Sequence, residues 1–127
     1  MKKEIVNKTD LQWLVDRFYD KIRQDKVVGY IFNDVMKVKW EKHLPVIYAF
    51  WENTLFYTGS YQGNAMKKHL NINRVTSLQK KHFNRWLQLF NETVDEYFEG
   101  EKAQLAKQRA HSIATIIQVK IAQAETK

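Results

Sequence analysis

Residues 82–114, HFNRWLQLFNETVDEYFEGEKAQLAKQRAHSIA, indicate the fold class most clearly. In the first half of this stretch, apolar side chains recur every three or four residues, which is typical of one face of an α-helix; they are Phe83, Trp86, Leu87, Phe90, Val94 and Phe98. Gly100 interrupts the pattern. A second helical period then runs from about Glu101 to Ala124, and its inner face comprises Leu105, Ala106, Ala110, Ile113, Ala114, Ile117 and Ile121. The stretch therefore predicts two consecutive helices with a break at Gly100.

Two further helices are predicted upstream. The first follows Thr9, which has the capping-box spacing to Gln12, and its apolar stripe comprises Leu11, Leu14, Val15, Phe18, Tyr19 and Ile22. The second covers roughly residues 39–57, with Pro45 in its first turns and with Trp40, His43, Ile47, Phe50, Trp51 and Leu55 on one side. Thr76 and Gln79 repeat the capping spacing before the helix that contains Trp86. We expect an all-α single domain over residues 1–127, with residues 1–7 as a frayed N-terminal extension.

Composition agrees with one helical domain and excludes several classes of protein. A chain of 127 residues with 44% hydrophobic residues can bury one substantial core. A single proline and four glycines are few for the turns of an all-β domain, and the absence of cysteine excludes disulfides and thiolate sites. The basic N-terminus has no apolar core behind it, and there is no run of about 18 apolar residues. We therefore expect a cytoplasmic protein with no membrane partner.

The net charge of +7 is spread along the chain. Lysine pairs occur at residues 2–3, 67–68 and 80–81, and no longer block of basic residues is present. Such dispersed charge is more typical of a solvated surface than of a nucleic-acid interface. We therefore expect no nucleic-acid partner. A basic, all-helical module that binds nucleic acid or protein without a cofactor remains the alternative interpretation.

The four histidines differ in their surroundings. His111 falls on the face of its helix opposite Ile113, which predicts a solvated side chain, and His82 lies in a first helical turn, where a structural role is expected. His43 is in line with apolar residues at helical spacing. His69 lies in the irregular stretch from residue 58 to about residue 74, beside the apolar residues Met66, Leu70 and Ile72. Long irregular segments inside compact domains are often functional.

Few chemistries can use one isolated histidine. The chain has no cysteine and no His-x-x-x-His pair for zinc, no paired Glu-x-x-His for a di-iron bundle, no G-x-S-x-G turn and no phosphate-binding glycine loop. A haem needs only one axial imidazole, because the porphyrin supplies four nitrogens. Its faces require aromatic and branched side chains, and Lys67, Lys68 and Arg74 could accompany its anionic propionates. Aromatic stripes fit an ordinary core equally well, so composition does not decide between these interpretations.

The order of several fragments is more specific. RFYDKIRQD (17–25), YIF (30–32), WEKHLPVIYAFW (40–51), MKKHLNI (66–72) and the stretch 82–114 together resemble a bacterial truncated haemoglobin of the third group. The resemblance covers about residues 8–122. The glycine pairs typical of the first two groups are absent, which favours the third. The resemblance implies the shortened globin fold, in which two helices pack across two others.

The resemblance also implies roles for particular residues. His69 would be the proximal ligand of the haem iron, and Tyr19, His43 and Trp86 would form the distal pocket. The residues expected to bind the cofactor, haem b (iron protoporphyrin IX), are Phe32, His43, Ile47, Phe50, Met66, Lys68, His69, Ile72 and Trp86. His43 could gate ligand entry, hydrogen-bond the ligand or ligate the iron weakly, and the sequence leaves these three roles open.

The function implied by the resemblance is reversible binding of O2, CO and NO at a five-coordinate or weakly six-coordinate iron. Hydroxyl and indole donors at Tyr19 and Trp86 would slow the release of O2. Slow release suits the oxidation of nitric oxide, peroxide chemistry or sensing better than bulk transport, and the chemistry would require a reductant that the sequence does not identify.

Overall fold

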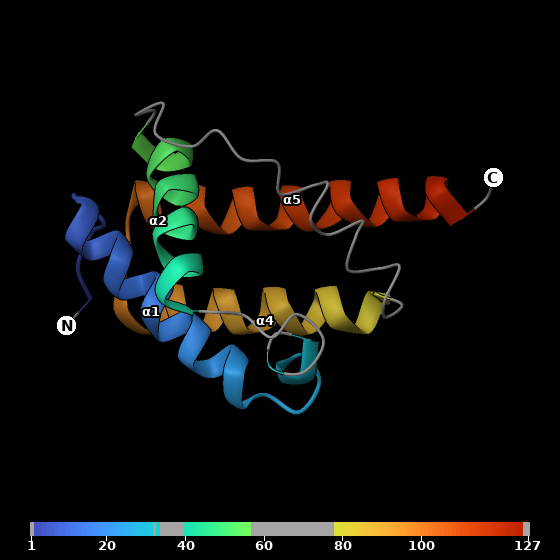
Figure 1. Ribbon diagram of the computed structural model, residues 1–127. Helices are drawn as coiled ribbons and strands as arrows, with labels where there is room; N and C mark the ends of the chain where they lie inside the picture. The colour runs from blue at the N-terminus through green and yellow to red at the C-terminus, as the bar shows by residue number, and fades with distance from the viewer. Residues whose placement is uncertain (1, 32, 34–39, 57–77, 126–127) are drawn as a thin grey trace.

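The described part of the chain consists mainly of four α-helices. The structure is a computed structural model that describes residues 2–31, 33, 40–56 and 78–125. The helices are α1 (Lys8–Gln24), α2 (Trp40–Phe56), α4 (Lys80–Tyr97) and α5 (Glu101–Glu125). Figure 1 shows α4 and α5 side by side with opposite chain directions, while α2 crosses them; α1 packs on both α4 and α2. The predicted all-α architecture of two helices across two is confirmed.

The starts of two helices differ from the prediction. Asn7, not Thr9, caps α1, because its side-chain oxygen accepts the backbone N–H of Asp10 at 2.9 Å. Helix α4 begins at Lys80 instead of near Thr76, and the backbone N–H of Gln79 donates to Nδ1 of His82 at 2.8 Å. At both starts a side chain satisfies a backbone N–H that has no partner within the helix: Asn7 accepts from Asp10 in the first turn of α1, and His82 accepts from Gln79, the N-cap residue of α4.

The N-terminal segment is docked on the helices, so the expectation of a frayed extension is wrong for residues 2–7. Lys3 forms a parallel bridge with Phe98: its N–H donates to the carbonyl of Tyr97 and its carbonyl accepts the N–H of Glu99. Ile5 is only 1% exposed and belongs to the main core. Lys3 also pairs with Asp10 at 2.6 Å. The burial of Ile5 and these polar contacts order a segment whose sequence alone has no helical period.

The core is built from the predicted apolar stripes. Phe18 of α1 and Phe90 of α4 are fully buried, and Trp51 of α2 stacks on Phe90 with ring centroids 5.0 Å apart. The inner face of α5 is formed mainly by small residues, which let α4 approach closely; its buried residues are Ala103, Ala106, Ala110, Ala114, Ile117 and Ile121. The core thus lies where α1, α2 and α4 meet and continues along the α4–α5 pair.

Helix α2 is fastened at its C-terminal end. The Lys102 ammonium donates to the carbonyl oxygen of Leu55 at 2.7 Å and lies 5.6 Å from the centre of the Phe56 ring. A cation is favourable at the C-terminus of a helix, where carbonyl groups lack intrahelical partners. Pro45 lies in the second turn of α2, close to the predicted position. Among the described residues, no helix has both the length and the apolar character needed to cross a membrane.

We predict that Gly100→Ala destabilises the protein by about 1–2 kcal/mol, because an L-residue is disfavoured at positive φ and Gly100 has φ of 95°. An added Cβ would also lie 2.6 Å from a carboxylate oxygen of Glu4, which is an exposed and flexible side chain. Chemical denaturation should therefore show little rescue in Glu4→Ala/Gly100→Ala. Full rescue in the double variant would assign the loss to the contact with Glu4 instead of the backbone.

Candidate functional site

Side chains from three helices meet on one side of the core. Tyr19 lies on α1, His43 and Ile47 lie one turn apart on α2, and Trp86 lies on α4. The helical stripes explain this arrangement: Tyr19 follows the fully buried Phe18, and Trp86 lies one turn before the fully buried Phe90. Tyr19 and Trp86 therefore each lie next to a fully buried aromatic ring on the same helix.

Tyr19 and Trp86 lie beside each other between α1 and α4, where the Trp86 indole acts on the pKa of the Tyr19 hydroxyl as a hydrogen-bond donor does. An indole N–H can only donate, so the Trp86 nitrogen donates to the hydroxyl oxygen of Tyr19. The Tyr19 side chain is only 8% exposed. Burial raises the pKa of the Tyr19 hydroxyl far above its ordinary value, and the hydrogen bond from Trp86 offsets only part of that rise. The hydroxyl therefore keeps its proton and remains a hydrogen-bond donor.

Aromatic contacts hold both partners of this hydrogen bond. The edge-to-face contacts of Phe18 with Tyr19 and Trp86 have centroid separations of 4.8 and 5.4 Å. Trp86 stacks on Phe90 at 5.7 Å with only 8° between the ring planes. Rings packed on two sides have few alternative rotamers. The indole plane is therefore fixed, and its N–H keeps one direction.

The rings of His43 and Trp40 approach Tyr19 from α2. The ring centroids of His43 and Tyr19 are 6.5 Å apart, those of Trp40 and Tyr19 are 5.3 Å apart, and those of Trp40 and His43 are 5.7 Å apart. The Arg23 guanidinium lies 5.1 Å from the Trp40 ring centre. Trp40 was not among the predicted site residues, although its position three residues before His43 on the same helical face was a usable signal.

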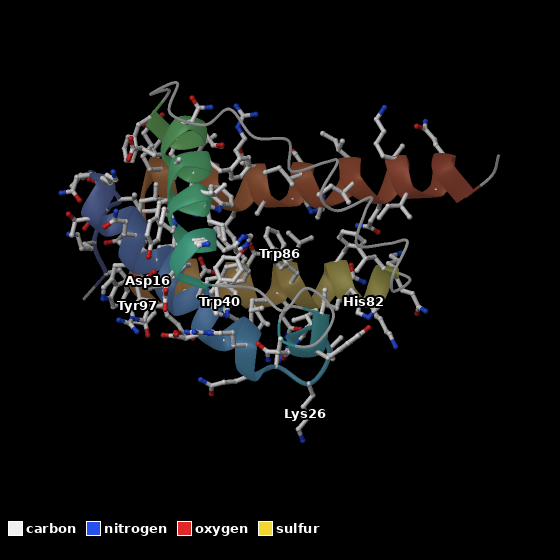
Figure 2. All side chains as sticks on the ribbon, viewed as in Figure 1. Asp16, Lys26, Trp40, His82, Trp86 and Tyr97 are labelled. Atoms are coloured by element: carbon white, nitrogen blue, oxygen red, sulfur yellow. The ribbon has the colours of Figure 1, made fainter. Side chains whose placement is uncertain are left out.

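The structure places two other predicted cofactor-binding residues on α2. Ile47 is buried in the main core, one turn after His43. Phe50 is half-buried and makes an edge contact with Trp51 at 5.4 Å. Figure 2 labels Trp40 at the start of α2 and Trp86 on α4, the two tryptophans that contact Tyr19 from different helices.

The remaining predicted site residues lie outside the described part of the chain. These are Phe32, Met66, Lys68, His69 and Ile72, so the expected proximal side of the site stays a prediction. Within residues 2–31, 33, 40–56 and 78–125, no group of three or more His, Asp or Glu side chains could hold a metal ion.

The other two histidines differ in exposure, and only the exposure of His111 was predicted. His111 is exposed on α5. His82 is only 6% exposed, and both of its nitrogens have partners. Nδ1 accepts the backbone N–H of Gln79, so the neutral ring carries its proton on Nε2 and donates to the Tyr30 hydroxyl at 3.1 Å. This pair joins the start of α4 to the chain that follows α1, and His82 lies one turn before Trp86 (Figure 2).

Comparisons with known proteins give one consistent result. The chain is 34% identical to the group 3 truncated hemoglobin ctb of Campylobacter jejuni, over 93% of each protein. Its structure matches the crystal structure of a group III truncated hemoglobin from Campylobacter jejuni with a TM-score of 0.83 and 33% identity, over 95% of each chain. No protein-family model matches the sequence. The identity and coverage are sufficient to show a shared family and fold.

We predict that acidification below pH of about 6.5 destabilises the protein through His82. Burial, and then the charge of Lys81, lower the pKa of His82 in the folded chain. The unfolded chain therefore takes up a proton first as the pH falls, and the free energy of unfolding decreases until the pH is below the folded pKa. The slope contributed by one group is at most about 1.4 kcal/mol per pH unit.

Denaturation at several pH values should show this slope in the wild type and in His111→Gln, which alters an exposed histidine. His82→Gln should lose it. An unchanged pH slope in His82→Gln would exclude His82 as its source.

Proposed function

Because the chain belongs to the group III truncated haemoglobins, we propose that it binds haem b through His69 and reversibly binds O2, CO and NO beside Tyr19, His43 and Trp86. The haem iron, when bound, supplies the position at which a diatomic gas is held. The remaining chemistry of the proposal belongs to the side chains of this chain.

The Trp86–Tyr19 hydrogen bond carries the proposal. Trp86 donates to the oxygen of Tyr19, and the buried hydroxyl keeps its own proton as a donor. Hydrogen bonds in sequence polarise one another, so the Tyr19 hydroxyl is a stronger donor than an isolated phenol. Bound O2 carries more negative charge than bound CO, so it accepts such a hydrogen bond more readily. This pocket therefore favours O2 and slows its release.

The described residues also suit an apolar macrocycle. Ile47, Phe50 and Trp86 offer branched and aromatic surface from α2 and α4, and Phe50 and Trp86 are half-buried. Haem pockets need this combination of apolar walls with a few placed polar groups. Phe32, Met66, Lys68, His69 and Ile72 complete the proposed set from the sequence prediction.

Slow release of O2 favours chemistry or sensing over bulk transport. Oxidation of nitric oxide and turnover of peroxide are the two reactions that we propose for a pocket with these donors. Both require electrons from a reductant outside this chain. The slow-release property itself rests on Tyr19 and Trp86 and can be tested without knowing that reductant.

We assign His43 to the entrance of the pocket. Its ring is half-buried and contacts the rings of Tyr19 and Trp40, so part of it reaches solvent while the rest borders the buried Tyr19 side chain. A side chain in this position can change rotamer without disturbing the fully buried rings. Ligand entry past His43 is therefore the role that its partial exposure supports.

The first test is an absorption spectrum of the purified protein, reduced and then exposed to CO. We predict a haem Soret band that shifts with CO, and loss of haem retention in His69→Ala because the axial imidazole is removed. His111→Ala, which changes an exposed histidine on α5, is the matched control. A colourless wild type would exclude the haem proposal. An unaltered spectrum in His69→Ala would exclude His69 as the ligand.

The second test concerns Tyr19. Removing a hydrogen bond of about 1.5–3 kcal/mol should speed the dissociation of O2 by roughly ten- to a hundredfold in Tyr19→Phe. Dissociation of CO should change little, because CO is a poorer acceptor. Stopped-flow displacement measures both rates. Equal acceleration for the two gases would remove Tyr19 from this role.

The third test concerns His43. His43→Ala should increase the rate at which CO enters from solvent after flash photolysis, because a side chain at the entrance has been shortened. The spectrum of the reduced protein without gas should stay the same. A low-spin six-coordinate spectrum that disappears in His43→Ala would instead assign His43 as a second axial ligand.

A further inference from the structure

An ion pair with a buried carboxylate joins the end of α1 to α4, next to the Tyr19–Trp86 hydrogen bond. Asp25 directly follows α1, and its carboxylate accepts Nε–H of Arg85 at 2.7 Å. The Asp25 side chain is only 5% exposed, and that of Arg85 is 32% exposed. Arg85 immediately precedes Trp86 on α4.

The Asp25 carboxylate has a complete set of donors. Its second oxygen accepts the backbone N–H groups of Val27 and Val28 at 2.9 and 3.1 Å. Burial alone would raise the pKa of Asp25, but Arg85 and these two N–H groups outweigh burial and lower it. Asp25 therefore stays ionised and fixes both the turn that leaves α1 and the position of Arg85.

The turn itself has little room to move. A Cβ on Gly29 would lie 3.0 Å from the carbonyl oxygen of Arg23 and 3.1 Å from that of Ile22, so this turn packs tightly on the last turn of α1. The Tyr30–His82 pair connects the turn to α4 again, three residues before Arg85. A shift of α4 relative to α1 would break both polar connections.

We propose that the Asp25–Arg85 ion pair positions Trp86 against Tyr19 and thereby sets the rate of O2 release. This inference rests on the proposed function, since it concerns the same pocket. Asp25 and Arg85 are positioning residues that act through the Trp86–Tyr19 hydrogen bond. Arg85 directly precedes Trp86, so the ion pair fixes how α4 is rotated about its axis at the turn that contains Trp86. This rotation determines whether the indole N–H points at Tyr19.

The chain offers a matched control for an ion pair between the same two helices. Lys21 of α1 and Glu96 of α4 also pair at 2.7 Å, but their side chains are 28% and 48% exposed. Exposed ion pairs hold geometry weakly because solvent screens them. Loss of the Lys21–Glu96 pair should therefore leave the pocket unchanged.

The experiment uses the haem-loaded protein with CO bound and measures exchange of the Trp86 indole proton by NMR, with its resonance assigned from Trp86→Phe. Indole exchange should be faster in Arg85→Gln and in Asp25→Asn, which keeps an amide oxygen for Val27 and Val28. Arg85→Lys should restore part of the protection, and Lys21→Met should match the wild type. O2 release should rise about three- to tenfold in Arg85→Gln.

A double-variant comparison separates positioning from a general loss of stability. If Arg85 acts through Tyr19, Arg85→Gln should have no further effect on O2 release in a Tyr19→Phe background. Unchanged indole exchange and O2 release in both Arg85→Gln and Asp25→Asn, with Tyr19→Phe still accelerating release, would overturn this inference alone. Additive effects of Arg85→Gln and Tyr19→Phe would also overturn it. Failure of the wild type to bind haem would overturn the proposed function and this inference together.

Discussion

The packing of Phe18 against Phe90 is the contact on which the other features depend. Both side chains are fully buried, and their rings meet edge to face with centroids 5.1 Å apart. This contact joins α1 to α4, and the stacking of Trp51 on Phe90 adds α2. Aromatic contacts of this kind are worth about 0.5–1.5 kcal/mol each beyond the area they bury. The pocket residues are direct neighbours of these rings, so the stability of the core and the precision of the pocket have the same origin.

The polar pair in this apolar setting is better explained by function than by stability. A buried hydroxyl or indole without a partner costs about 1–3 kcal/mol, whereas two apolar rings of similar shape would cost the fold almost nothing. Tyr19 and Trp86 satisfy each other, but a Phe–Phe pair would be an equally good core. A protein under no functional demand has no physical reason to prefer the polar pair. The demand that we propose is a donor aimed at a bound gas.

The sequence predicted features that depend on local periodicity. The four helices, the break at Gly100 and the inner faces of α1 and α5 follow from stripes of apolar residues, and the structure contains them. Helix starts were predicted poorly because several polar residues near each end could cap it, and only the three-dimensional turn selects Asn7 over Thr9. The docking of Lys3 beside Phe98 has no local signal in the sequence.

The positions of Tyr19, His43 and Trp86 came from the resemblance, because periodicity places a residue on a helical face but does not say which faces meet. The polar connections around them could not be predicted at all. His82 meets Tyr30 across 52 residues of sequence, and Arg85 meets Asp25 across 60. Each partner alone is an ordinary polar residue, in the first two turns of α4 or in the chain that follows α1. Only the packing of α1 on α4 brings them together.

The two ion pairs between α1 and α4 show why burial matters more than distance. Both measure 2.7 Å between nitrogen and oxygen, yet the Glu96 side chain is 48% exposed and the Asp25 side chain only 5%. An exposed ion pair contributes about 0–1 kcal/mol to the stability of the fold, and it tolerates movement because water can replace either partner. Removing the partner of a buried carboxylate lowers the free energy of unfolding by about 3–5 kcal/mol, although a well-packed apolar pair in place of both charges would be just as stable. The Asp25–Arg85 pair is therefore a weak source of net stability and a strong constraint on geometry, since a displaced arrangement leaves one oxygen of the Asp25 carboxylate without its donor. Such a constraint is useful at the one place where a small rotation of α4 would turn the Trp86 N–H away from Tyr19.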